Sequence, residues 1–329
     1  MEGMGVQDYR TCLHLRLHAP QRGRCGRRLD DRYAADDRAD IKRRIAGHRA
    51  DRHLTGSNMA LNLAEAVENP VLRRLRADQM ALGMVLRISR SGDIARISRA
   101  AGHDFLFIDV QHAIYSLETI GHITQTALGC GVAPLVRVRS CRDPDISVML
   151  DCGVTGIVCP DVNTPDDARQ IVQTCKFAPI GRRSVTSGYP FFDYRPVPQQ
   201  EAIGLLNANT LVVCMIESLE GLANCEAIAA VDGVDVLHVG LTDLLADMGK
   251  PGAYGDPQAM AAVTRITHAA IACGKYAGVG GDSDLGRQES FIRDGVRFIS
   301  MPSDAALLAA GAKRAADDLR RIAGEELKN

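Results

Sequence analysis

Residues 104–112 (DFLFIDVQH) set the pattern of this chain, because a short apolar run there ends abruptly in polar residues. A strand that is apolar at every position is buried on both faces, as are the strands of a parallel sheet covered by helices. Comparable runs recur after residue 59 and alternate with longer stretches that have helical spacing. This rhythm predicts parallel strands joined by crossover helices.

Eight apolar runs are expected to be strands: Ala81–Ile88, Phe105–Val110, Pro134–Val138, Gly156–Val162, Leu211–Glu217, Val234–Gly240, Tyr276–Gly280 and Phe298–Pro302. Seven stretches are expected to be helices: Ser116–Leu128, Asp143–Asp151, Thr164–Thr174, Leu219–Ala229, Pro257–Ala272, Asp284–Arg293 and Ala305–Ala323. Thr164, followed by a proline and two acids, is typical of a helix N-cap. The predicted class is therefore α/β, with a (β/α)8 TIM barrel over residues 59–329. An open doubly wound sheet is the alternative, but no GxGxxG fingerprint follows the first strand.

Composition and charge restrict the function classes. The 329 residues are 46% hydrophobic, enough for a large core, and 39 Lys and Arg nearly balance 40 Asp and Glu, for a net charge of −1. With no chain-wide field, neither nucleic acid nor a membrane surface is the expected partner. The apolar runs are shorter than the roughly 20 residues of a membrane span. The ten Cys form no CxxC pair, which favours a reducing cytoplasm over a disulfide framework.

The first 58 residues differ from the rest of the chain. They contain 12 Arg and one Lys against eight acidic residues, and they lack sustained apolar periodicity. Their interspersed acids argue against a transit peptide and an RNA-binding arm. We expect residues 1–58 to be an irregular, disordered basic extension, or alternatively the product of a start site assigned upstream of Met59.

Charged residues stand at the ends of four predicted strands, which is where a TIM barrel assembles its active site. Asp109 ends the second strand, with His112 three residues later, Arg137 ends the third, Glu217 ends the fifth and Asp243 follows the sixth. Each has a structural explanation by itself, such as a helix cap or a local ion pair. Together, acids gathered at one small mouth require a counter-ion.

A divalent cation held by Glu217 and Asp243 would meet that requirement. Two carboxylates, with water and substrate completing an octahedron, suit Mg²⁺ or Mn²⁺, with Co²⁺ as an alternative. Zinc fits less well, because the histidines after Met59 form no HxH or HExxH pair. His238, inside the sixth predicted strand, is expected to be a hydrogen-bonded core residue.

The sequence resembles the HpcH/HpaI aldolase family of metal-dependent 2-oxo acid aldolases, which includes hydroxy-oxo-heptanedioate aldolase and 2-dehydro-3-deoxyglucarate aldolase. The resemblance covers roughly residues 75–316 and lies in eight blocks of sequence: 104–112 (DFLFIDVQH), 134–138 (PLVRV), 150–153 (LDCG), 181–185 (GRRSV), 215–218 (MIES), 233–235 (GVD), 240–244 (GLTDL) and 247–252 (DMGKPG).

The resemblance implies a class II aldolase that reversibly cleaves a 4-hydroxy-2-oxo acid to pyruvate and an aldehyde through an enolate. It places the metal on Glu217 and Asp243, and it places the keto oxygen beside Arg137. It makes His112 the base, oriented by Asp109. Four more positions are expected to contact substrate: Gly240, Thr242, Met215 and Gln111.

The chain departs from the family pattern at some of these positions. Gln111 stands where the family has Glu, Met215 stands where many members carry Gln, and Leu241 and Thr242 replace Pro and a small residue. The alternatives left open are an oxaloacetate decarboxylase, a citrate-synthase-like condensing enzyme and a catalytically inactive binding homologue.

Two further expectations concern assembly. The resemblance suggests a homo-oligomer, a trimer or hexamer, with C-terminal helices packed across subunits. The aromatic segment Thr186–Pro198 is expected to form a lid or a subunit contact, with plain structural packing as the competing interpretation.

Overall fold

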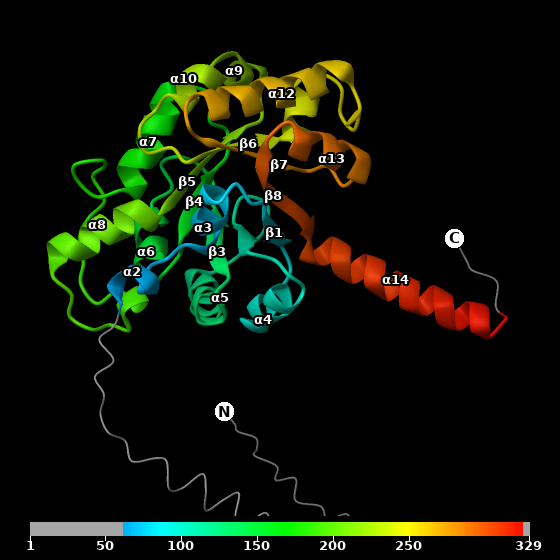
Figure 1. Cartoon of the computed structure of the whole chain (residues 1–329). Coiled ribbons are helices and arrows are strands. Elements are labelled where there is room, and N and C mark those ends of the chain that lie inside the picture. The colour runs from blue at the N-terminus through cyan, green and yellow to red at the C-terminus, as the bar shows by residue number, and fades with distance from the viewer. Residues whose placement is uncertain (1–61, 325–329) are drawn as a thin grey trace, which may run out of the picture. The chain divides into compact units, whose positions relative to one another are not determined.

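A computed structural model describes residues 62–324 of the chain, and the predicted extension 1–58 lies outside them. Eight parallel strands close into a barrel in sequence order, each paired with the next and the last with the first (Figure 1). The strands are β1 (Ala81–Leu86), β2 (Phe105–Asp109), β3 (Ala133–Arg137), β4 (Gly156–Cys159), β5 (Leu211–Ile216), β6 (Val236–Gly240), β7 (Tyr276–Gly280) and β8 (Val296–Ser303). The predicted (β/α)8 barrel is confirmed.

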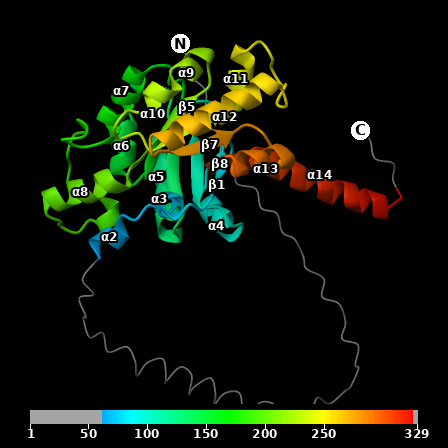
Figure 2. The same cartoon turned by 45° about the horizontal axis from the view of Figure 1, so that its top comes forward.

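The described residues form thirteen helices, most of which lie around the outside of the barrel (Figure 2). They are α2 (Leu63–Ala66), α3 (Pro70–Arg76), α4 (Asp93–Ala100), α5 (Leu117–Cys130), α6 (Ile146–Asp151), α7 (Pro165–Cys175), α8 (Gln199–Asn209), α9 (Leu219–Ala223), α10 (Cys225–Ala229), α11 (Leu241–Asp247), α12 (Pro257–Ala272), α13 (Leu285–Arg293) and α14 (Asp304–Ile322), with a 3-10 turn η1 (Pro190–Phe192). None of these helices is long and apolar enough to cross a membrane.

Most predicted boundaries agree with the structure to within a few residues, and two differences matter. The first strand ends at Leu86 rather than Ile88, so Arg87 follows the strand instead of lying inside it. The single helix predicted over Leu219–Ala229 is two short helices that meet at Asn224.

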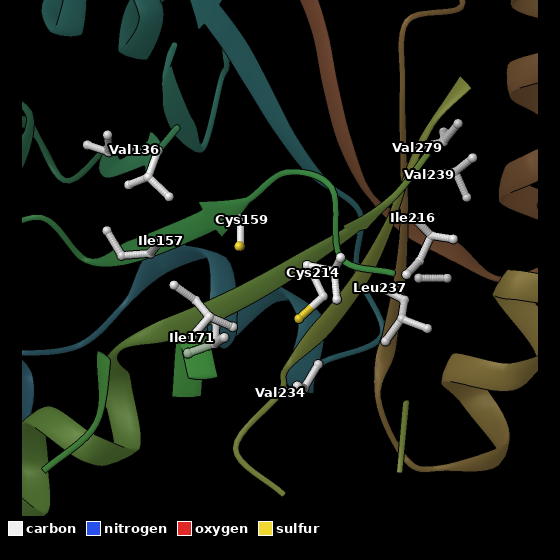
Figure 3. Packing of buried hydrophobic residues seen from close by; sticks show 14 of the residues in the cluster. Val136, Ile157, Cys159, Ile171, Cys214, Ile216, Val234, Leu237, Val239 and Val279 are labelled. Carbon is white, nitrogen blue, oxygen red and sulfur yellow. The ribbon is translucent and has the colours of Figure 1, made fainter. Parts of the chain in front are cut away.

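The core has an inner and an outer layer because strand side chains alternate in direction. Inside the barrel, Phe105 stacks on Phe298 with ring centroids 4.5 Å apart, and Leu75 of α3 belongs to the same cluster. Outside, residues such as Cys214 and Ile171 fill the space between strands and helices (Figure 3). Both strand faces are therefore buried, as the unbroken apolar runs predict.

The aromatic segment 186–198 packs at the end of the barrel where the strands begin. Tyr189 and Phe192 are buried in a small cluster with Phe177 of the preceding loop. Phe191 borders a surface depression together with Ala133, the first residue of β3. The expectation of a lid over the strand ends is wrong, because no residue of this segment lines the cavity there and its buried aromatic side chains pack in the separate cluster with Phe177; the subunit contact stays a prediction.

The last helix, α14, leaves the barrel instead of lying along it (Figures 1 and 2). Of its 19 residues only Asp304 is buried. Leu308 and Leu319 are 64% and 69% exposed. A helix with that much exposed apolar surface has an unpartnered face.

Candidate active site

The alternation of strand side chains explains why the charged residues meet. Phe105 and Phe107 point into the barrel, so Asp109 is the next inward position on β2, and Arg137 follows Leu135 on β3 in the same way. Asp109 and Arg137 are also direct partners in the strand register. The barrel interior is thus lined by apolar side chains along the strands and by charged side chains at the carboxyl ends of β2 and β3.

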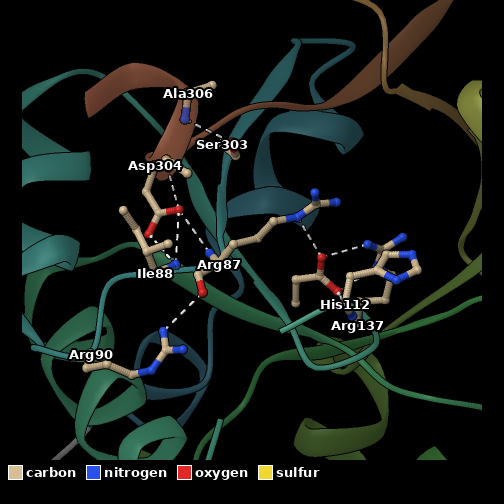
Figure 4. A network of polar contacts seen from close by, with 10 residues as sticks. Arg87, Ile88, Arg90, His112, Arg137, Ser303, Asp304 and Ala306 are labelled. Atoms are coloured by element: carbon tan, nitrogen blue, oxygen red, sulfur yellow. Dashed lines mark hydrogen bonds and ion pairs between the residues drawn. The ribbon is translucent and has the colours of Figure 1, made fainter. Parts of the chain in front are cut away.

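Asp109 is the centre of a cluster of charges that includes Arg137 and Arg87, both of which are labelled in Figure 4. It is fully buried, and its carboxylate accepts from Arg137 Nε at 3.0 Å and Nη2 at 2.7 Å, and from Arg87 Nε at 3.0 Å. Burial alone raises the pKa of Asp109, but the hydrogen bonds and positive charges, chiefly from Arg137, outweigh it and hold the pKa below its ordinary value. The carboxylate is therefore ionised, and it fixes Arg137 in place.

His112 lies on the loop after β2 and lines the mouth of the barrel. Asp109 Oδ1 accepts from the main-chain N–H of His112 at 3.1 Å. The carboxylate thus anchors the loop that carries the imidazole and does not hold the ring itself. The structure therefore shows Asp109 positioning His112 through the main chain, and not through a hydrogen bond to the imidazole ring.

Glu217 and Asp243 face the same cavity from β5 and α11. Glu217 is 4% exposed, and its Oε1 accepts from the Asp161 N–H at 2.8 Å. Its Oε2 is buried and has no hydrogen-bond partner among the described residues. Burial first, and the charges of Asp161 and Asp243 after it, raise the pKa of Glu217 to about 7. Within residues 62–324 no cation forms an ion pair with this carboxylate, although the more distant charge of Arg137 lowers its pKa in part.

Those residues fit a hard divalent cation, because the orphaned buried oxygen and the neighbouring acid supply oxygen ligands. Gly240 makes room for Glu217, since a Cβ there would lie 2.4 Å from Oε2. No group of three or more His, Cys, Asp or Glu suited to a metal occurs within residues 62–324. The protein would thus provide two ligands and leave the other positions to water and substrate.

The cavity itself measures about 480 Å³ and opens at the carboxyl ends of the strands. The residues lining it are Val85, Arg87, Phe107, His112, Arg137, Met215, Glu217, His238, Gly240, Leu241, Thr242, Asp243, Gly280, Gly281, Ser283, Ser300, Met301, Pro302 and Ser303. Such a volume suits a small ligand.

His238 lies under this cavity as the inward residue of β6. Its Nε2 is 3.0 Å from Ser300 Oγ, and its ring packs edge-on against Phe298. Nδ1 is buried with no partner in the described part of the chain. Burial, and then the charge of Arg137, lower the pKa of His238 to about 3, so this ring is neutral.

The structure brings most of the predicted site residues together. Seven line the cavity: His112, Arg137, Met215, Glu217, Gly240, Thr242 and Asp243. Asp109 lies behind Arg137, while Gln111 is absent from the lining, which differs from the expectation that it contacts substrate.

Sequence reasoning missed Arg87, Ser300 and the cavity-facing role of His238. For Arg87 the signal was present, since a charged residue directly after an apolar run is the pattern that identified Asp109 and Arg137. Because the predicted strand ended at Ile88, Arg87 was counted as a residue inside the strand and not as a residue at its end.

Comparison with known proteins points to one family. The model of the HpcH/HpaI aldolase/citrate lyase family matches residues 84–310. The chain is 35% identical over 265 residues to 4-hydroxy-4-methyl-2-oxoglutarate aldolase of Chaetomium globosum, covering 79% of this chain and 98% of that protein. It is 33% identical over 260 residues to hydroxypyruvate/pyruvate aldolase of Cupriavidus necator, covering 77% and 93%.

A solved structure agrees with this match. The crystal structure of an HpcH/HpaI aldolase from Desulfitobacterium hafniense superimposes with a TM-score of 0.73 at 26% identity, covering 78% of this chain and 97% of that one. The family match begins within β1 and ends within α14, so it includes residues of all eight strands.

Proposed function

The chain belongs to the HpcH/HpaI aldolase/citrate lyase family and is a carbon–carbon lyase of the aldolase type, and on that premise we propose how it works. We propose that it cleaves a 4-hydroxy-2-oxo acid to pyruvate and a carbonyl compound with a divalent cation, Mg²⁺ or Mn²⁺, held by Glu217 and Asp243. The observation that carries the proposal is the buried Oε2 of the cavity-lining residue Glu217, which has no partner in the described residues.

The bound cation would supply a Lewis acid that stabilises negative charge on the keto oxygen of the substrate. Arg137 adds a second positive charge to the same small space. Two of its nitrogens are committed to Asp109, so its guanidinium is fixed before substrate arrives. A charge that needs no reorganisation stabilises a developing oxyanion best. Arg137 therefore lowers the barrier to enolate formation.

His112 is the base in this proposal. Cleavage breaks the C3–C4 bond after the 4-hydroxyl proton leaves, and the electron pair passes to the C2 oxygen as the pyruvate enolate. Imidazole is the side chain most often used for such a transfer. His112 borders the cavity at the rim, where it would take that proton, and a proton returned to C3 completes pyruvate.

The test is exchange of the methyl protons of pyruvate with D₂O, followed by NMR in the presence of Mg²⁺. This half-reaction needs the base, the cation and Arg137 but no second substrate. We expect exchange that stops on addition of EDTA and in Glu217→Gln. Glu220→Gln is the matched control, because Glu220 is an exposed acid on α9 outside the cavity lining. No exchange in the wild type would contradict the proposal.

Product analysis distinguishes the competing activities. An oxaloacetate decarboxylase would form the same pyruvate enolate from oxaloacetate with loss of CO₂, whereas a citrate-synthase-like enzyme would add the enolate of an acetyl thioester to oxaloacetate. A catalytically inactive homologue would show no exchange. The aldolase names of both relatives favour aldol cleavage over these three alternatives.

We also propose that α14 mediates a homo-oligomer, a trimer or hexamer. Its exposed Leu308, Leu319 and Ile322 recur with Ala312 and Ala315 at alternating spacings of four and three. That spacing forms one apolar stripe of the kind that packs against another helix.

The eight cysteines of the described residues are all free, which supports a reducing cytoplasm as the location.

A further inference from the structure

We propose that Arg87 determines specificity for the second product of cleavage, by binding a carboxylate on the carbonyl half of the substrate. This inference rests on the proposed aldolase function and adds the substrate class: the acceptor is an anionic carbonyl compound and not a neutral aldehyde.

Arg87 has hydrogen-bonding capacity that the protein does not use. Its Nε donates to Asp109 Oδ2, and its two Nη groups make no hydrogen bond within residues 62–324. The side chain is 47% exposed, whereas that of Arg137 is 7% exposed. Arg87 lines the cavity, so the two Nη groups remain available to a ligand there.

Asp109 does not need Arg87 as a partner. It already accepts two hydrogen bonds from Arg137 and one from the N–H of His112, and a carboxylate has about four acceptor sites. The bond from Arg87 occupies the remaining one. Because this bond is made by Nε, it orients the Arg87 guanidinium and leaves the two Nη groups for another ligand.

The main chain of Arg87 is held as firmly as its side chain. Asp304 Oδ1 accepts from the Arg87 N–H at 2.9 Å, and the Arg87 carbonyl accepts from Arg90 Nη1 at 3.1 Å. Fixing a binding group in advance reduces the entropy lost when a ligand is bound. Arg87 is thus a pre-oriented cation.

The chemistry of the guanidinium selects the ligand. It has no lone pair, so it cannot hold the metal, and its fork of donors matches a carboxylate. The cavity lining from β7, β8 and their loops includes Gly280, Ser300 and Ser303 together with Met301 and Pro302, and β8 is the strand paired with β1. This part of the cavity can hold a short oxygen-rich group, and Arg87 is its cation.

The experiment compares two acceptors of similar size for aldol addition to pyruvate: glyoxylate, which carries a carboxylate, and acetaldehyde, which does not. The quantity measured is the ratio of their kcat/KM values in the same enzyme preparation with Mg²⁺. A defect in enolate formation cancels in this ratio. We expect Arg87→Met to lower the ratio roughly 10- to 100-fold, mainly through the KM of glyoxylate, as for a lost charge-assisted hydrogen bond.

Two variants control the interpretation. Arg87→Lys keeps the charge without the fork and should retain part of the preference. Arg96→Met removes an exposed arginine of α4 that lies outside the cavity lining, and it should leave the ratio as in the wild type.

Equal loss with both acceptors in Arg87→Met would overturn the inference and make Arg87 a positioning residue for Asp109. Failure of the wild type to use glyoxylate, in protein that exchanges pyruvate protons, would overturn it as well. Absence of that exchange would instead refute the proposed function, so the two failures are distinguishable.

Discussion

Asp109 and Arg137 form a two-pronged ion pair at the top of the barrel interior, with Nε 3.0 Å from Oδ1 and Nη2 2.7 Å from Oδ2. They are register partners on adjacent strands, and both are nearly excluded from solvent. The pair holds the guanidinium of Arg137 at the cavity floor, with Phe107 beneath it at 5.4 Å from the ring centroid.

Asp109→Asn should destabilise the fold and nearly abolish turnover. It leaves Arg137 buried without its counter-charge, and breaking a buried pair costs about 3–5 kcal/mol. The amide keeps one acceptor oxygen for the His112 N–H, but the NH₂ group that replaces the other oxygen cannot accept from Arg137 Nη2 or Arg87 Nε. We expect a lower urea midpoint and at least a roughly 100-fold loss of kcat/KM in folded protein. Near-wild-type values of both would contradict the structural role of the pair.

Gly240→Ala should weaken metal binding without disturbing the rest of the barrel. The new Cβ would lie 2.4 Å from Glu217 Oε2, so the carboxylate must move away from its place in the cavity. Titration calorimetry with Mn²⁺ should show at least a roughly tenfold weaker affinity. Gly121→Ala in α5 is the control, since nothing lies within 4 Å of its added methyl group and it should bind Mn²⁺ normally. Unchanged affinity in Gly240→Ala would argue against Glu217 as a ligand.

His238→Phe should change how stability depends on pH. The folded pKa is about 3 against 6.5 for an unperturbed histidine, so below pH 6.5 the unfolded chain binds a proton that the folded protein does not. The wild type therefore loses stability through this residue as the pH falls from 6.5 towards 3, by up to about 1.4 kcal/mol per pH unit.

Urea unfolding at pH 8, 6 and 5 measures this effect. The difference in unfolding free energy between His238→Phe and the wild type should be constant above pH 7.5 and should shift in favour of the variant at pH 5. Parallel pH curves would mean that His238 is protonated as easily in the folded state as in the unfolded chain.

Leu308→Asp combined with Leu319→Asp should dissociate the oligomer. Both side chains are mostly exposed on α14, and a charge placed in a helix–helix contact must be desolvated. Light scattering after size exclusion should show a smaller species with an unchanged circular dichroism spectrum. Replacing the exposed Arg314 with Asp in the same helix controls for charge alone. A monomeric wild type would refute the proposed assembly.

Most of the barrel and much of the site could be predicted from the sequence, because apolar runs mark the strands and charged residues mark the strand ends. Unbroken apolar runs such as Leu211–Ile216 can be stable only when both faces are covered, and a barrel places every strand end at one mouth. Asp109, Arg137 and Glu217 could therefore be grouped before their distances were known. The predicted capping of α7 by Thr164 is confirmed, because that signal depends only on neighbouring residues.

Other features depend on contacts that a sequence does not record. Arg87 was missed because β1 ends at Leu86, two residues before the predicted end at Ile88. The N–H of Arg87 donates there to Asp304, which is 217 positions away in the sequence. The outward course of α14 could not be predicted from its composition, since an amphipathic helix packs equally well on its own barrel or on another molecule. Likewise, the position of the aromatic segment is set by its cluster with Phe177.

Asp304 joins the beginning of α14 to the loop after β1. Its carboxylate accepts from the N–H groups of Arg87, Ile88, Ser89 and Ala305. These bonds connect the outlying helix to the residue that we assign to acceptor binding. In the proposed oligomer, a displacement of α14 by a neighbouring subunit would reach the rim of the cavity through this one carboxylate, and assembly would then influence the proposed choice of acceptor.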